Sequence, residues 1–216
     1  NKGIFFSKIQ KEMPELISDY IYLKSVDDIY KLTHWKTFPC IVKPANKDLS
    51  QSFYKLNNGL KAIYFDDEES LKKEVEKLLK LSYELIIQEY INFKADEDEM
   101  PTYTYFDNKS NLRVYANGIK KIIYPPKFGT AIALELSFNK ELIKTSEKIG
   151  NAISWTGPLM IEFVKDRVKN QIKILEVNTR PWLFHDFYRH RGLPFVSNII
   201  REFSSKSIQE NTLVIM

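Results

Sequence analysis

Hydrophobic and polar positions along the chain switch between a helical period and a strand period. Apolar residues recur every three to four positions in several stretches, a spacing that predicts amphipathic helices at 4–13, 25–35, 67–82, 139–153 and 192–203. Alternating or short apolar runs predict strands at 19–25, 39–44, 83–91, 102–107, 112–124, 130–136, 158–166 and 171–180.

Two Asn–Gly pairs indicate turns in this pattern, because both residues tolerate the positive φ that tight hairpins need. Asn57-Asn58-Gly59 predicts that residues 50–67 form a hairpin, and Asn117–Gly118 predicts a turn within 112–124. Helices and hairpins follow one another in two successive groups. That order predicts an α+β protein with two lobes.

The last predicted hairpin carries polar side chains on an otherwise apolar pair of strands. Glu176, Asn178 and Arg180 occupy alternate positions, so they point to one face. If Val164 pairs with Ile174, Glu162 faces Glu176 with about 5 Å between their Cβ atoms. Opposed carboxylates repel, and such a pair persists when it shares a proton, a basic side chain or a divalent cation.

Two carboxylates and the amide oxygen of Asn178 form a hard ligand set, which suits Mg²⁺ or Mn²⁺ better than Zn²⁺. Mg²⁺ completes its coordination with water and phosphate oxygens, and Arg180 is placed to hold a phosphate with two hydrogen bonds. The alternative is an exposed strand face on which the glutamates pair with a nearby Lys or Arg. The pattern alone leaves both open.

Composition and charge favour a globular protein and argue against several other classes. The 216 residues are enough for one large domain or two small ones, and 44% hydrophobic with 28% charged residues is ordinary for a globular protein. A formal charge of +4 is too small to indicate nucleic-acid binding. The single cysteine, Cys40, excludes a disulfide within the chain, and its apolar neighbours indicate burial. We see no membrane span or signal peptide, and therefore predict a cytoplasmic protein.

With "MIEF" (160–163) and "EVNTR" (176–180) on successive strands, the chain resembles the ATP-grasp superfamily of ATP-dependent carboxylate ligases. The likeness is greatest to its carbamoyl-phosphate-synthase-like and predicted carboxylate–amine ligase branch, and it covers nearly the whole chain. Other stretches in the same order are "NK" at the start, "FPCIVKP" (38–44), "IIQEYI" (86–91) and "IKKIIYPPKFGT" (119–130). The resemblance implies an ATP-grasp fold in which two α+β lobes clasp ATP between antiparallel sheets.

The resemblance also implies roles for single residues. Glu162, Glu176 and Asn178 would bind Mg²⁺ or Mn²⁺, and Arg180 and Lys120 would assist phosphoryl transfer. Contacts to ATP would come from Lys2, Lys43 and Lys61, from the hinge residues Gln88, Glu89, Tyr90 and Ile91, and from one of Glu97, Asp98 and Glu99. Lys43 ends an apolar strand, so its charge calls for an anionic partner, although a surface lysine with a buried stem is the alternative.

The chain departs from the family pattern in several places. Residues 44–59, which usually form a glycine-rich loop over the phosphates, contain one glycine, and backbone N–H groups of Ser50 to Phe53 would have to cover ATP instead. Asn92-Phe93 replaces the usual Pro-Gly, and Ile122 stands where a second basic residue is expected. The basic cluster of His185, Arg189, His190 and Arg191 would either meet a substrate carboxylate or form a basic surface loop.

We therefore predict an ATP-grasp N-terminal lobe at 1–91, which includes a small lid at about 38–91, and a C-terminal lobe at 92–216 with the metal site. The resemblance implies a preceding N-terminal α/β domain ahead of residue 1. The predicted function is ligation of a small-molecule carboxylate to an amine, without nucleic-acid or membrane partners. There are two alternatives: a nucleotide-binding module without turnover, and an interaction domain that binds no nucleotide. The substrates and the oligomeric state do not follow from the sequence.

Overall fold

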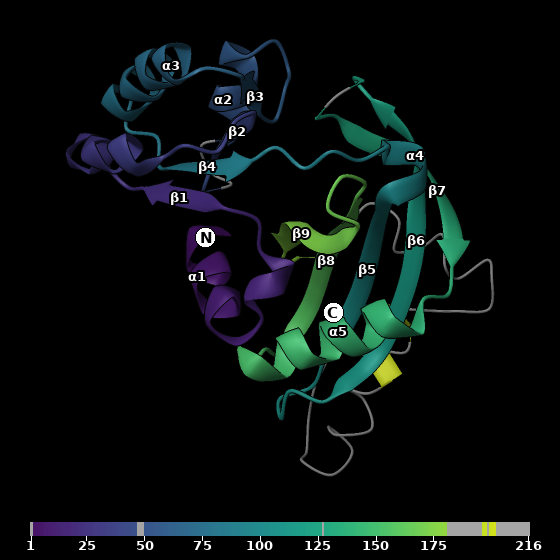
Figure 1. The fold of residues 1–216 in the computed structure, drawn as a ribbon. Coiled ribbons are helices and arrows are strands. Elements are labelled where there is room, and N and C mark those ends of the chain that lie inside the picture. Colours follow the sequence, from purple (N-terminus) through teal and green to yellow (C-terminus); the bar gives the residue numbers. More distant parts are fainter. Residues whose placement is uncertain (1, 47–49, 127, 181–195, 198, 202–216) are drawn as a thin grey trace, which may run out of the picture. The chain divides into compact units, whose positions relative to one another are not determined.

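The computed structural model describes residues 2–46, 50–126, 128–180, 196–197 and 199–201 of the chain (Figure 1). The helices are α1 (Lys2–Glu12), η1 (Pro14–Leu16), η2 (Val26–His34), α2 (Ser50–Leu56), α3 (Glu68–Lys80), α4 (Ala95–Asp98) and α5 (Lys140–Ala152). The strands are β1 (Tyr20–Leu23), β2 (Cys40–Pro44), β3 (Ile63–Phe65), β4 (Leu85–Glu89), β5 (Glu99–Phe106), β6 (Leu112–Tyr124), β7 (Thr130–Ser137), β8 (Gly157–Asp166) and β9 (Gln171–Asn178).

The strands form two sheets, with the orders β1-β4-β2-β3 and β7-β6-β5-β8-β9. Pairing is antiparallel between β1 and β4, β2 and β3, β2 and β4, and β5 and β6. The predicted α+β class is therefore confirmed. In the first sheet β2 lies beside β4 although helices and β3 separate them in the chain, and this crossover brings Lys43 to the strand that carries Gln88.

The chain forms two compact units, each built from discontinuous segments. The first comprises 1–99, 119–135 and 164–175, and the second comprises 100–118, 136–163 and 176–216. The predicted lobe boundary after residue 91 stays a prediction.

Helix α3 shows how sequence pattern builds the core of the first unit. Asp67 begins the helix by accepting a hydrogen bond from the Ser70 N–H at 2.8 Å. One face of the helix packs against buried residues of the four-stranded sheet, and that face consists of Leu71, Val75, Leu78 and Leu79. Burying each such side chain stabilises the fold by about 1.5–3 kcal/mol. Cys40 lies in the same core, and burial raises the pKa of its thiol to about 11.

The predicted hairpin at 50–67 is wrong, because its first half is the helix α2. Asn58 and Gly59 do have positive φ values of 52° and 82°, but they end this helix. The Gly59 N–H donates to the Tyr54 carbonyl at 2.7 Å, a bond typical of a helix C-terminus. Phe53 on this helix is fully buried in the core of the first unit.

In the second unit, Leu142, Ile143 and Ile149 of α5 are buried, and Gly150 lies against the ring of Phe106 on β5. The predicted turn at Asn117–Gly118 is wrong, because β6 runs without interruption through both residues. Asn117 is buried opposite Thr102 on β5 and donates to the Thr102 hydroxyl at 2.6 Å. Its side-chain oxygen accepts from the Asn139 N–H at 3.2 Å, so tertiary partners replace the turn.

The predicted closing helix at 192–203 lies mostly outside the described residues, of which 196–197 and 199–201 are helical. Across the part of the chain that the structure describes, every helix is too short or too polar to cross a membrane.

Candidate functional site

Lys43 is the fourth residue of the buried strand β2, and the residue is only 7% exposed. Its ammonium donates to the side-chain oxygen of Gln88 at 2.6 Å and to the carbonyl of Leu175 at 2.9 Å. It also lies 5.5 Å from the centre of the Phe6 ring. The alternative of a surface lysine is therefore wrong. Leu175 directly precedes Glu176, so the lysine contacts the strand that bears a predicted metal ligand.

Gln88 is fully buried on β4, and both ends of its amide are held. The amide oxygen accepts from Lys43, and the amide nitrogen donates to the Ser18 hydroxyl at 2.8 Å. The orientation of this side chain is therefore set by hydrogen bonds. The sequence reasoning did not find Ser18, because nothing in its local pattern distinguishes it from other serines.

The hinge that follows Gln88 is tied to two neighbouring segments. The Glu89 N–H donates to the Asp19 carbonyl at 2.8 Å, and the Tyr90 N–H donates to the Pro39 carbonyl at 3.0 Å. The Tyr90 ring meets the Tyr64 ring edge-on with 5.3 Å between centroids, and Ile91 is 3% exposed. The four predicted hinge residues thus form an ordered segment at the end of β4.

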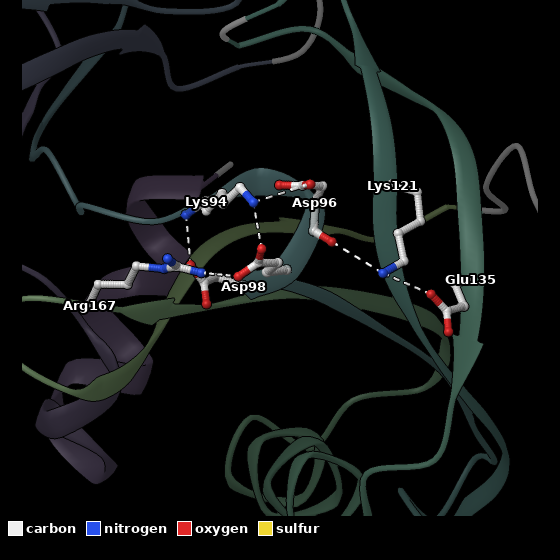
Figure 2. A network of polar contacts seen from close by, with 7 residues as sticks. Lys94, Asp96, Asp98, Lys121, Glu135 and Arg167 are labelled. Carbon is white, nitrogen blue, oxygen red and sulfur yellow. Dashed lines mark hydrogen bonds and ion pairs between the residues drawn. The ribbon is translucent and has the colours of Figure 1, made fainter.

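The acids that follow the hinge belong to a network of charged groups (Figure 2). Arg167 donates through its guanidinium to both Glu97 and Asp98, and Lys94 contacts Glu97 and Asp96. Burial disfavours the charged form of Asp98, but hydrogen bonds from Arg167 and the Lys94 N–H hold the pKa of this carboxyl below its usual value. The hydrogen bond from Lys94, followed by that from Arg167, lowers the pKa of Glu97.

The third acid, Glu99, forms a buried ion pair with Lys120. The lysine ammonium donates to the carboxylate, and the two side chains are 10% and 4% exposed. A buried charge needs such a partner, because leaving it alone in a medium of low polarity is costly. The sequence reasoning named both residues but did not foresee that they bind each other.

The other predicted nucleotide contacts lie at separate places in the first unit. Lys61 donates to the Gly129 carbonyl at 2.8 Å, within the "PPKFGT" stretch that carried part of the resemblance. Lys2 begins α1, and its backbone N–H donates to the Ala45 carbonyl at 3.2 Å, just beyond β2. Ser50 to Phe53 form the first turn of α2 rather than an extended loop.

The predicted metal ligands lie on the neighbouring strands β8 and β9. Glu162 is four residues before the end of β8 and Glu176 is five residues after the start of β9, so the two are at nearly the same height above the turn. Glu162 is 8% exposed, Glu176 and Asn178 are half-buried, and Arg180 beyond the strand is exposed. The register that opposes Glu162 to Glu176 stays a prediction.

The oxygen donors of this set fit Mg²⁺ or Mn²⁺ chemically, because hard cations prefer carboxylate and amide oxygens. Among the described residues, no group of three or more His, Cys, Asp or Glu side chains could hold a metal, and the predicted set contains only two carboxylates. The basic cluster of His185, Arg189, His190 and Arg191 lies outside the described residues.

Two residues of the β8–β9 turn were missed by sequence reasoning. Arg167 holds Glu97 and Asp98, and Lys169 holds the carboxylate of Glu89, which raises the pKa of Lys169. Charged residues in a short turn are usual, so the sequence contains no signal that would have singled them out.

Comparison with known proteins shows which solved structures the fold resembles. No protein-family model matches the sequence. The multifunctional protein ura1 of Schizosaccharomyces pombe is 25% identical over 187 residues, which are 82% of this chain and 7% of that protein. D-alanine–D-alanine ligase from Bacillus anthracis, complexed with ATP, is 18% identical with a TM-score of 0.59, over 97% of this chain and 68% of that one.

A third match is N5-carboxyaminoimidazole synthetase from Staphylococcus aureus, complexed with ADP. It is 18% identical with a TM-score of 0.58, over 88% of this chain and 47% of that one. These structures are ATP-grasp ligases, and the chain has the ATP-grasp fold. The predicted ATP-grasp fold is thereby confirmed. The chain spans less than a tenth of the length of the curated relative and about half of the synthetase.

Proposed function

We propose that this chain is the ATP-binding part of an ATP-dependent ligase that joins a small-molecule carboxylate to an amine. The observation that carries the proposal is Lys43. This lysine is 7% exposed. Its ammonium donates hydrogen bonds to Gln88 on the proposed base-binding strand and to the carbonyl of Leu175, which precedes Glu176 on the proposed metal-binding strand. Its positive charge at this point suits the phosphates of a nucleotide. The ATP- and ADP-bound structures of the same fold give independent support.

Each predicted residue has a role in this reaction. A substrate carboxylate oxygen would attack the γ-phosphorus of ATP, the bond to ADP would break, and an acyl phosphate would result. The amine would then attack the acyl carbon, losing a proton as phosphate leaves. Glu162, Glu176 and Asn178 would hold Mg²⁺ or Mn²⁺, which when bound neutralises phosphate charge. Arg180 would bind the transferred phosphoryl group.

Lys120 keeps a phosphate role in this proposal, with Glu99 as the carboxylate that fixes its ammonium in place. That assignment leaves two acids for the ribose. The side chain of Glu97 is 50% exposed whereas that of Asp98 is 9% exposed. We therefore assign the ribose contact to Glu97.

A second candidate function is nucleotide binding without turnover. Its support is the glycine-poor segment after β2, which begins the helix α2 at Ser50 where the family pattern expects a loop over the phosphates. An interaction domain that binds no nucleotide is the third candidate. It requires that Glu162 and Glu176 do not share a face.

Thermal unfolding with ATP, in the presence and absence of Mg²⁺, separates the third candidate from the others. The unmodified chain should gain stability from ATP only when Mg²⁺ is present. In Glu176→Gln that gain should vanish, while the Tm without ligand stays level or rises because one of two opposed charges is removed. Glu135→Gln, which alters a strand acid that is 58% exposed, is the control and should keep the gain. An undiminished Mg²⁺-ATP effect in Glu176→Gln would remove Glu176 from the metal site.

Release of ADP with a panel of carboxylates and amines, using the full-length protein, separates ligation from binding alone. Carboxylate-dependent ADP release supports the ligase. Tight Mg²⁺-ATP binding without ADP release under any combination would favour the second candidate.

A further inference from the structure

The turn between β8 and β9 holds the segment that follows β4 at both of its ends. Lys169 donates to the Glu89 carboxylate at the end of β4. The Arg167 N–H donates to the Asn92 carbonyl at 2.9 Å, and the Arg167 guanidinium donates to Glu97 on α4. Figure 2 shows the guanidinium beside Asp98, to which it also donates. Residues 89–98 therefore contact one turn through a lysine, a backbone N–H and an arginine.

The turn itself is ordered by a buried acid. Asp166, which is 4% exposed, accepts hydrogen bonds from the Val168 N–H at 2.8 Å and the Lys169 N–H at 3.1 Å. Arg167 and Lys169 therefore project from a backbone whose conformation is already set. A planar guanidinium that binds two carboxylates fixes direction as well as distance, which an ammonium does not.

Segment 89–98 contains the hinge and Glu97, to which the proposed function assigns adenine and ribose. The strands on either side of the turn carry Glu162 and Glu176, to which it assigns the metal. We propose that Arg167, supported by Lys169, is a positioning residue that fixes the nucleoside-binding segment 89–98 on the β8–β9 turn. This inference rests on the proposed function and adds to it two residues beyond the predicted phosphate and metal contacts.

Exposed ion pairs contribute little to stability on their own, and the Arg167 side chain is 43% exposed. Its effect should therefore appear in nucleoside affinity rather than in the unfolding temperature. A loosened segment would lose conformational entropy each time adenosine binds, which weakens binding. Inorganic triphosphate lacks base and ribose, so its binding would not order the segment.

Arg113 offers a matched control. It too is an arginine next to a hairpin turn, its side chain is 45% exposed, and its guanidinium contacts the carboxylate of Asp107. Its turn joins β5 to β6 within the second unit, whereas the hinge segment belongs to the first, so Arg113→Ala should leave nucleotide binding as it is. Arg167→Lys is a second variant, which keeps the charge but cannot hold two carboxylates in one plane.

The test is calorimetric titration of the full chain with Mg²⁺-ATP and with Mg²⁺-tripolyphosphate, together with amide hydrogen exchange over residues 89–98. Arg167→Ala should bind Mg²⁺-ATP about tenfold more weakly and tripolyphosphate unchanged, and exchange in the segment should accelerate. Arg167→Lys should lose about threefold for ATP, and it carries the test if Arg167→Ala does not fold. Arg113→Ala should change none of the three measurements.

Equal losses for ATP and tripolyphosphate, or normal ATP binding with normal exchange in both Arg167 variants, would overturn the inference while leaving the proposed function intact. Absence of Mg²⁺-ATP binding by the unmodified chain would overturn both.

Discussion

Replacement of Lys43 by methionine tests the centre of the proposed site, because methionine fills a similar volume without the charge. Two opposing effects act on the free energy of unfolding. Fully buried Gln88 loses a hydrogen-bond donor, which costs about 1–3 kcal/mol, while removal of a buried ammonium relieves a desolvation penalty of similar size. We therefore expect a net change within about 2 kcal/mol, or a Tm shift of no more than roughly 8 °C for a chain of this length.

The effect on nucleotide affinity should be larger and in one direction. A charge-assisted hydrogen bond from the Lys43 ammonium to a phosphate oxygen contributes about 1.5–3 kcal/mol. Its loss corresponds to roughly 10- to 150-fold weaker binding of Mg²⁺-ATP. Adenosine lacks phosphates, so its affinity should change much less.

Lys173 provides the matched control for this substitution. It is a buried lysine at 8% exposure whose ammonium also donates to a backbone carbonyl, that of Glu15 at 2.8 Å. Lys173→Met should alter stability to a similar degree and leave the affinities for Mg²⁺-ATP and adenosine as they are. Calorimetric titration measures both affinities. Equal losses for ATP and adenosine in Lys43→Met, or equal effects of the two lysine variants on ATP, would refute the assignment of Lys43 to the phosphates.

Two further predictions concern stability. A glycine-to-alanine change inside a helix usually stabilises it by up to about 1 kcal/mol. At Gly150, however, the added Cβ would lie 2.2 Å from the buried Phe106 ring, so urea unfolding of Gly150→Ala should show a free energy of unfolding that is lower by about 1–3 kcal/mol. Any gain in this free energy would contradict the packing. Burial opposes the charge of Asp107, yet hydrogen bonds from Asn111, the Lys109 N–H and Arg113 hold the pKa of its carboxyl well below the usual value. The ionised Asp107 carboxylate therefore stabilises the folded state fully above the unfolded pKa of about 3.9, and this contribution is lost as the pH falls below that value. Between pH 5 and pH 2 the free energy of unfolding should fall more steeply in the unmodified chain than in Asp107→Asn, and parallel curves would contradict this.

Local sequence determined the elements in which the cap and the apolar face lie within one short stretch of the chain. Helix α3 has its cap at Asp67 and its apolar face at Leu71, Val75 and Leu78 within one short stretch, and its predicted and observed ranges agree closely. The same holds for α5 and for the β8–β9 hairpin. The residues that resemble the ATP-grasp pattern also lie in short contiguous motifs, which is why the fold could be predicted from them.

The two Asn–Gly pairs show where local information ends. Positive φ at Asn58 and Gly59 satisfies a hairpin turn and a helix end equally well, and in the observed helix Phe53 is buried in the core beside the ring of Tyr83. At Asn117 the side chain gains partners from Thr102 and Asn139, 15 and 22 residues away, and the strand continues through it. Both outcomes depend on neighbours that a short window of sequence does not contain.

The sequence by itself determined which residue types line the candidate site: lysines, a glutamine, acids and an arginine in a fixed order along the chain. Tertiary structure alone decided which of them touch. Lys43 meets Gln88 across 45 residues, Lys120 meets Glu99 across 21, and Arg167 meets Asp98 across 69. The physical reason is that a charged side chain entering the interior must find its partner in space, and the order of strands in the sheets sets which distant residue is there.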